Sequence, residues 1–196
     1  MLTYALALFF LLITPGPGVL SVAGVGSAFG PGAGTRYIAG IMVGTNLVAA
    51  AVVFGVAASI MANDRIRLIM LTASLLYLVY LAFRIAFAGS TIAIIKATKA
   101  PGFWAGVVLQ VVNPKAYAII ATLITGFAFW PENLVAETAI KLLIFNSISV
   151  PVHFAWLFVG ITFHRLNLKP DTQRRVNMLM AISMLLVVGL ALIAPK

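Results

Sequence analysis

The chain contains no cysteine and only four acidic residues among 196. Without cysteine it can form neither a disulfide framework nor a thiolate metal site, and it cannot relay electrons across a membrane through thiols. The acids, all of which fall in or near expected loops, are Asp64, Glu132, Glu137 and Asp171. No carboxylate is therefore expected inside the membrane, which argues against transport of metal ions or of strongly cationic substrates. We expect no metal, no cofactor and no catalytic residues, because no embedded Ser/Lys or Ser/His pair or pair of carboxylates can be discerned.

Charge of either sign is scarce, and apolar residues take its place. Charged residues make up 9% of the chain and apolar residues 63%, whereas soluble domains contain about 25% charged residues. The composition indicates an integral membrane protein. A helix needs about 20 residues to cross the hydrocarbon layer, so the chain has room for about six. We predict one transmembrane domain over residues 1–196, and we interpret its first apolar segment as a retained helix and not as a cleaved signal.

Apolar runs bounded by Gly, Pro, Asn and charges set the expected helices. They are too long and too continuous for strands of a membrane barrel. The predicted helices cover residues 2–28, 37–61, 66–88, 103–129, 134–163 and 176–194. The fold class is therefore all-α, with the chain crossing the membrane in six helices.

The net charge of +9 comes from bases scattered through short loops. There is no basic tail and no aromatic platform, so we expect no nucleic-acid partner. With six helices, one side of the membrane receives Arg36, Arg84, Lys96, Lys99, Arg165, Lys169, Arg174 and Arg175. The other side receives Arg65, Arg67, Lys196 and, less clearly, Lys141. The richer side is predicted to be cytoplasmic, which places both termini outside.

Prolines interrupt two of the expected helices at matching places. Pro15 and Pro17 break the first helix and Pro114 breaks the fourth. Proline lacks the N–H that an α-helix uses, so these breaks should release the carbonyl groups of Leu11, Ile13 and Gln110. Within the membrane such backbone is tolerated only where protein or a water-lined cavity surrounds it. Paired breaks in two halves of a chain point to a transporter's binding site.

The two halves of the chain also align with each other. An offset of 99 or 100 residues places Thr14 on Asn113, Pro15 on Pro114, and Asn46 on Asn146. The repeats cover about residues 1–90 and 100–196, and each holds an odd number of helices, so they must have opposite orientations. The sequence therefore predicts an inverted repeat whose broken helices meet near the membrane midplane, although the match is short enough for chance to explain it.

Two motifs surround the breaks. Residues 12–18 read Leu-Ile-Thr-Pro-Gly-Pro-Gly, and residues 103–106, Phe-Trp-Ala-Gly, lead to Asn-Pro-Lys-Ala at 113–116. Over nearly its full length the chain resembles the LysE/RhtB family of bacterial amino-acid exporters, in which Thr/Ser-Pro-Gly-Pro and Asn-Pro-Lys-Ala are signatures. The resemblance implies a secondary transporter in the bacterial cytoplasmic membrane that exports a small amino acid by antiport. Many members carry asparagine where this chain has Gly18, and an acidic residue where it has Asn46. The resemblance therefore does not identify the substrate.

Lys115 is the most informative side chain of the second motif. It lies near the middle of the predicted helix 103–129, where an unpaired lysine costs about 2.5–3.5 kcal/mol. One interpretation is that its ammonium binds the carboxylate of a zwitterionic substrate. The other is that it neutralises freed carbonyls or reaches into a water-filled vestibule.

The remaining candidate site residues combine free backbone with polar side chains. The break at Thr14, Pro15, Gly16, Pro17 and Gly18 precedes a half-helix whose N–H groups suit an anion, although it can equally be a packing kink. Asn46, Asn113 and Asn146, which we expect to be buried amides, are the matching candidates with Pro114 and Lys115, and each amide can instead join helices. Weaker candidates are Thr45, Gln110, Tyr117 and Ser149.

His153 is the one side chain expected in the membrane that titrates near neutral pH. We regard it as a candidate for proton coupling, with hydrogen-bonded packing as the alternative. Gly40 and Gly44 permit close helix contact, either inside the molecule or in a homodimer. Besides amino-acid export, the sequence leaves open an exporter of inorganic ions and a membrane scaffold that transports nothing.

Overall fold

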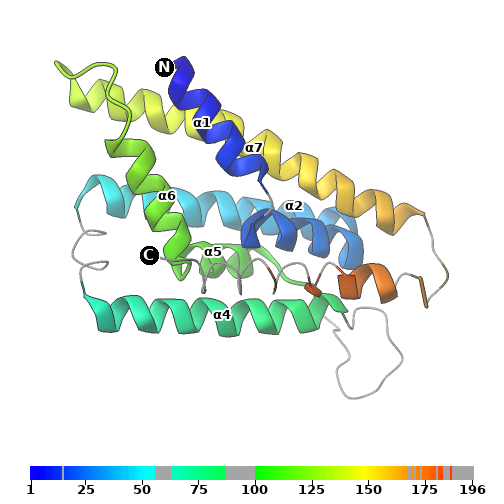
Figure 1. Cartoon of the computed structure of the whole chain (residues 1–196). Coiled ribbons are helices and arrows are strands. Elements are labelled where there is room, and N and C mark those ends of the chain that lie inside the picture. Colours follow the sequence, from blue (N-terminus) through cyan, green and yellow to red (C-terminus); the bar gives the residue numbers. More distant parts are fainter. Residues whose placement is uncertain are drawn as a thin grey trace.

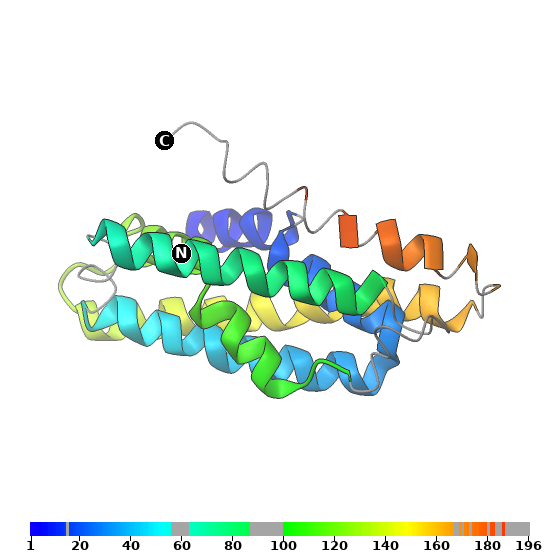
Figure 2. The ribbon, with the colours of Figure 1, turned by 90° about the horizontal axis from the view of Figure 1, so that it is seen from below.

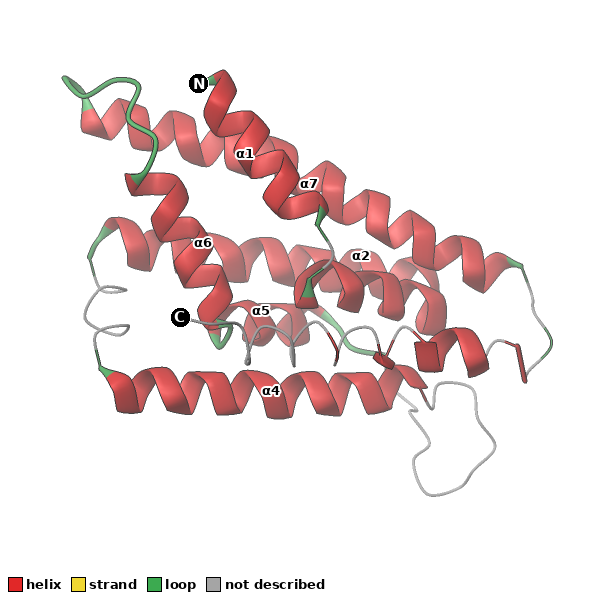
Figure 3. Cartoon of the chain, viewed as in Figure 1, coloured by secondary structure: helices red, strands yellow, loops and turns green. Residues whose placement is uncertain are grey.

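The computed structural model describes residues 1–14, 16–55, 63–86, 100–166, 169, 171–172, 174–179, 181–182 and 186. Within these ranges the regular structure is helical and no strand occurs, which confirms the predicted class (Figures 1 and 3). The helices are α1 (Leu2–Ile13), α2 (Pro17–Val53), α4 (Asp64–Ala86), α5 (Phe103–Val111), α6 (Pro114–Thr125) and α7 (Leu134–Arg165).

Helix α2 reverses its direction at Gly30. This residue has φ 77° and ψ −174°, a conformation open to glycine and strained for other residues. Pro31 follows at the first position of the new helix, where a proline is well tolerated. The two arms, residues 17–29 and 31–53, run in opposite directions (Figure 1), and the Tyr37 hydroxyl donates to Ser21 Oγ at 3.1 Å between them. The predicted helix start at Tyr37 is therefore wrong, because the proline restarts the helix immediately.

The arms of α2 pack mainly on α7 and α5, and glycines allow these contacts. A side chain at Gly40 would collide with the backbone carbonyl of Phe103 on α5, and one at Gly160 with the carbonyl of Ala23. Gly44 likewise faces α5, at the backbone of Val107. The glycine pair at positions 40 and 44 thus serves packing inside the molecule. Helix α4 lies along one side of this core, in contact with α2, α5 and α6 (Figure 2).

The predicted fourth helix is broken, as its proline indicates. Helices α5 and α6 are bent by 67° around Val112 and Asn113. Helix α6 ends at Thr125 and not at Phe129, so the predicted end is four residues too late. Residues 126–133 form the connection to α7, which begins at the predicted Leu134 after the side chain of Asn133 accepts the Ala136 N–H at 3.0 Å.

A buried ion pair fastens this connection to the start of α7. The carboxylate of Glu137 accepts the N–H groups of Phe129 and Trp130, and it lies 2.5 Å from Lys141 Nζ. That ammonium donates to the carbonyl of Ile124 at 2.6 Å, at the end of α6. Both charged residues are only 3% exposed, so Lys141 is part of the fold's interior and does not stand in an outer loop.

The first helix closes the same end of the molecule. The Tyr4 hydroxyl donates to the Lys141 carbonyl at 3.0 Å, and its ring meets Phe127 edge to face at 5.8 Å between centroids. Tyr4 and Leu8 belong to an apolar cluster with residues of α2, α6 and α7. The N-terminus and the connection 126–133 therefore lie together (Figure 1).

Large apolar side chains cover the outer surface. Leu68 on α4, and Leu143 and Phe158 on α7, are 64–68% exposed, while the side chains of Ser149, Asn113 and His153 lie inside. Of the helices described, α2 and the stretch Leu134–Phe163 are long and apolar enough to cross a membrane, and the bent pair α5 and α6 is a third span if counted as one. Most of the predicted sixth helix, 176–194, lies outside the described residues.

Candidate functional site

The first break interrupts the chain between α1 and α2. Thr14 ends α1 with extended backbone, and its hydroxyl donates to the Phe10 carbonyl at 2.6 Å. Gly16 is the N-cap of α2 and has no side chain to cap it. The Leu20 N–H bonds to the Gly16 carbonyl at 3.0 Å, whereas the N–H groups of Gly18 and Val19 belong to the first turn and have no acceptor within the helix. The break therefore presents two N–H groups and the positive end of a helix dipole.

At the second break the backbone carbonyl groups have other hydrogen-bond partners than the sequence predicted. The Gln110 carbonyl is not released, because the Asn113 N–H donates to it at 3.2 Å in a tighter turn. The Val111 carbonyl, one residue later, accepts the Tyr117 hydroxyl at 3.0 Å. Tyr117 is thus a structural partner of the break. Pro114 cannot donate the regular helical hydrogen bond. The Asn113 N–H and the Tyr117 hydroxyl instead donate to the carbonyl groups at the break.

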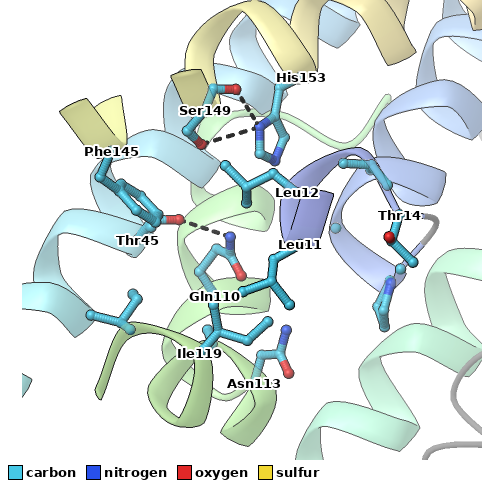
Figure 4. A pocket seen from close by; sticks show the side chains of 16 residues that line it. Leu11, Leu12, Thr14, Thr45, Gln110, Asn113, Ile119, Phe145, Ser149 and His153 are labelled. Atoms are coloured by element: carbon cyan, nitrogen blue, oxygen red, sulfur yellow. Dashed lines mark hydrogen bonds between the residues drawn. The ribbon is translucent and has the colours of Figure 1, made fainter. Parts of the chain in front are cut away.

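Both breaks border one pocket of about 90 Å³. Since a site for one water needs about 10–15 Å³ of such space, the pocket can hold several waters or a small polar molecule. Its lining comes from α1, both arms of α2, α5, α6 and α7 (Figure 4). The lining residues are Leu11, Leu12, Thr14, Gly16, Pro17, Gly18, Val19, Thr45, Gln110, Asn113, Ala116, Ile119, Ile120, Phe145, Ser149 and His153.

Six of the predicted site residues meet in this lining, namely Thr14, Gly16, Pro17, Gly18, Asn113 and His153. Three weaker candidates, Thr45, Gln110 and Ser149, join them. Pro114 begins α6 directly after Asn113. Pro15 lies outside the described residues, and so does the side chain of Lys115, whose backbone is in the first turn of α6. The expected meeting of the two breaks is thus found at a cavity.

Asn46 and Asn146 do not line the pocket. Their side chains bind each other reciprocally, at 2.9 Å and 3.0 Å, and each also donates to the carbonyl four residues earlier in its own helix. Asn46 is exposed on the surface of α2, so the prediction of a buried amide there is wrong. With both amides occupied, this pair joins α2 to α7.

His153 projects from α7 into the pocket and is 3% exposed (Figure 4). Its Nδ1 lies 2.8 Å from the Ser149 carbonyl oxygen and 3.4 Å from the Ser149 hydroxyl, so the expectation that no Ser/His pair lies inside is wrong for these two residues. A carbonyl oxygen can only accept, so Nδ1 carries the hydrogen of this bond. In the neutral ring Nε2 is then the acceptor. That atom faces Gly18, since a Cβ built on Gly18 would lie 4.0 Å from it.

Gln110 supplies a second polar group from α5. The side-chain N–H donates to Thr45 Oγ1 on α2 at 2.8 Å, which leaves the amide oxygen directed into the pocket (Figure 4). Gln110 is 8% exposed and Thr45 4% exposed. The hydrogen bond fixes which end of the amide reaches the cavity.

Apolar side chains form the rest of the wall, and the sequence did not identify them. Leu11 and Leu12 come from the end of α1, Ile119 and Ile120 from α6, and Phe145 from α7. In a chain so rich in apolar residues these positions carry no distinguishing pattern. No charged side chain lines the pocket among the residues described, and none of their His, Asp and Glu side chains form a cluster of three that suits a metal ion.

Comparison with known proteins identifies the family of the chain. No curated protein and no solved structure matches the chain. The family profile described as LysE type translocator matches residues 9–195, a range that includes both breaks and every residue of the pocket lining. The chain therefore belongs to the LysE type translocator family of membrane transport proteins.

Proposed function

We propose that this protein exports a small amino acid, or a close derivative, through the pocket at the two helix breaks. The observation that carries the proposal is the composition of the lining. The lining combines backbone N–H groups of the first turn of α2, the acceptors of Gln110 and His153, and apolar side chains. Such a set complements a zwitterion with a short side chain.

The carboxylate of the substrate binds at the start of α2. The N–H groups of Gly18 and Val19 lie in the first turn there, and the helix dipole adds partial positive charge. Gly18 has no side chain, so an anion can approach the backbone closely. Lys115, which follows Asn113 and Pro114 at the second break, adds its ammonium to the carboxylate in this proposal.

The ammonium of the substrate binds at the hydrogen-bond acceptors of the lining, one of which faces Gly18. The amide oxygen of Gln110 and the Nε2 lone pair of His153 are both acceptors directed into the cavity (Figure 4). Leu11, Ile119 and Phe145 surround the side chain. The volume of about 90 Å³ favours a substrate with a short side chain. Because no carboxylate is among the described lining residues, a substrate with a second positive charge is disfavoured.

Transport proceeds by alternating access of two inverted halves, each contributing one broken helix. The reciprocal bond between Asn46 and Asn146 supports this arrangement, since the two residues are 100 positions apart and use the same pattern of contacts. In the proposed topology six helices cross the bacterial cytoplasmic membrane, the termini face outward, and a proton is exchanged for the substrate.

Export of an inorganic ion by the same family would require ligands of another kind. Hard cations select oxygen ligands, usually with carboxylates, and softer metals select thiolates or imidazoles. The described lining offers one imidazole, amides and hydroxyls. We therefore favour an organic zwitterion as the substrate. If no substrate is found, the alternative is a membrane scaffold that transports nothing.

Two glycines provide a matched test of the site. Gly18 and Gly32 each follow a proline that begins an arm of α2, and at both a Cβ would have its nearest neighbour at 4.0 Å, which is ordinary contact. Gly18→Leu places an isobutyl group in the pocket, whereas Gly32→Leu places it at an exposed position. In vesicles loaded with labelled amino acids, we expect Gly18→Leu to abolish efflux and Gly32→Leu to retain it. Equal efflux from both variants, or no efflux of any amino acid by the unaltered protein, would overturn the proposal.

A further inference from the structure

The hydrogen bond of His153 restricts what its second nitrogen can do. Because Nδ1 donates to the Ser149 carbonyl at 2.8 Å, the neutral ring offers only Nε2 as an acceptor. The carbonyl belongs to the same helix, one turn earlier, so the ring keeps this orientation while α7 stays folded. Protonation does not break the bond, since Nδ1 donates in both charge states. Protonation changes only Nε2, which becomes a donor.

Nε2 of His153 lies among residues of the pocket lining. Gly18 lies opposite it on the first arm of α2, Thr45 comes from the second arm, Gln110 and Asn113 come from the break between α5 and α6, and Leu11 and Leu12 come from α1. None of these side chains is charged or titratable, and no other lining residue described is titratable. Lys115 stands two residues beyond Asn113, with its side chain outside the described residues.

We propose that His153 Nε2 binds either a proton or the ammonium of the substrate, and that this exclusion couples export to proton entry. The inference rests on the proposed function, because it assumes an amino acid in this pocket. An ammonium donates an N–H to the Nε2 lone pair, and a proton consumes the same lone pair. The protonated ring also repels the ammonium. The two ligands therefore cannot share the site.

The exclusion makes the substrate and the proton move in opposite directions and sets the charge moved in each cycle. Substrate arriving from the cytoplasm displaces the proton from Nε2 inward, and a proton arriving from outside displaces the substrate outward. A zwitterion carries no net charge, so each cycle moves one positive charge into the cell. An inside-negative membrane potential and an acidic exterior both drive export.

Proton release on binding tests this directly. Purified protein in weak buffer with a pH indicator receives an amino acid that efflux assays identify as a substrate, and heat of binding is measured in parallel. We expect release of up to about one proton per substrate bound at acidic pH, falling to none in alkaline buffer. The apparent Kd should rise roughly tenfold per pH unit toward acid, because only the unprotonated fraction binds.

His153→Gln keeps an amide acceptor in the site but cannot titrate. We expect this variant to bind substrate without proton release and to exchange labelled for unlabelled substrate, while it loses accumulation driven by a pH gradient. His153→Asn provides a second variant if the first fails to fold. Thr162→Val is the control, because Thr162 is an exposed residue of α7 outside the pocket lining, with its hydroxyl on the Phe158 carbonyl, and its proton release should match that of the unaltered protein.

The outcomes separate the two proposals. If no amino acid binds or is exported, the proposed function fails. If an amino acid binds and is exported but the unaltered protein releases no proton, only the role of Nε2 fails. Proton release that persists in His153→Gln also overturns that role and assigns the coupling to another group.

Discussion

Asn46 on α2 and Asn146 on α7 bind each other through two side-chain hydrogen bonds, of 2.9 Å and 3.0 Å. Each residue also donates to its own helix, Asn46 to the Met42 carbonyl and Asn146 to the Leu142 carbonyl. The two contact patterns are equivalent on exchange of the residues. Such equivalence is what a two-fold relation between halves of the chain would produce.

The energy of this pair can be measured with a double-mutant cycle. We expect Asn46→Ala and Asn146→Ala each to lower the free energy of unfolding, and the double variant to lose less than the sum of the two. Hydrogen bonds between membrane helices average about 0.6 kcal/mol, with a maximum near 1.7 kcal/mol, so the coupling energy should fall in that range. Unfolding in mixed micelles supplies the values, and a coupling energy of zero would mean that the contact does not join the helices.

The close contact between α2 and α5 gives a second prediction. Gly40→Ala requires the Phe103 backbone to move away, since the new methyl group would collide with its carbonyl. Overpacking of this kind costs about 1–3 kcal/mol. Gly32→Ala is the control, because Gly32 is exposed in the same helix, and alanine there should be neutral or stabilise by less than about 1 kcal/mol. Equal effects of the two substitutions on thermal unfolding would contradict the packing described.

The sequence predicted the helix breaks because proline acts locally. Pro17 and Pro114 each begin a helix wherever the surrounding chain places them, and Asn133 caps the start of α7 at the predicted residue. The prediction of helix ends from the sequence was wrong where a glycine and a proline act together. Residues 29–36 lie between two predicted helices, but Gly30 reverses the chain in one step and Pro31 restarts the helix.

Contacts between residues far apart in the chain could not be predicted from the sequence, for another reason. Apolar residues face lipid, protein and the pocket alike in this chain, so periodicity cannot tell Phe145 in the lining from Leu143 on the surface. The polar candidates were easier, because a polar side chain in the membrane needs a partner. His153, Gln110 and Thr45 were found in this way, while the mutual pairing of Asn46 and Asn146 required the structure.

Glu137 and Lys141 lead to a prediction about stability. Removing one partner of a buried ion pair leaves the other charge without compensation, whereas replacing both often costs little. We expect Glu137→Gln and Lys141→Met each to lower the unfolding temperature more than the double variant does. Glu132→Gln, at an exposed position in the same connection, should have no effect. A double variant that is the least stable of the set would show that the two residues act independently.

The bond between Gln110 and Thr45 leads to the last prediction, which concerns transport. Thr45→Val removes the acceptor of the Gln110 side-chain N–H, so the amide loses its fixed orientation and its oxygen no longer points reliably at the substrate ammonium. A lost buried hydrogen bond of about 1.4 kcal/mol corresponds to roughly a tenfold fall in kcat/KM for efflux. Thr45→Ser keeps the hydroxyl and should export normally. Gln110→Leu also removes the amide oxygen and should be impaired at least as much as Thr45→Val, and adding Thr45→Val to it should change little, because the group that Thr45 orients is already gone. If Thr45→Ser is as impaired as Thr45→Val, the shape of the side chain matters and the hydrogen bond does not.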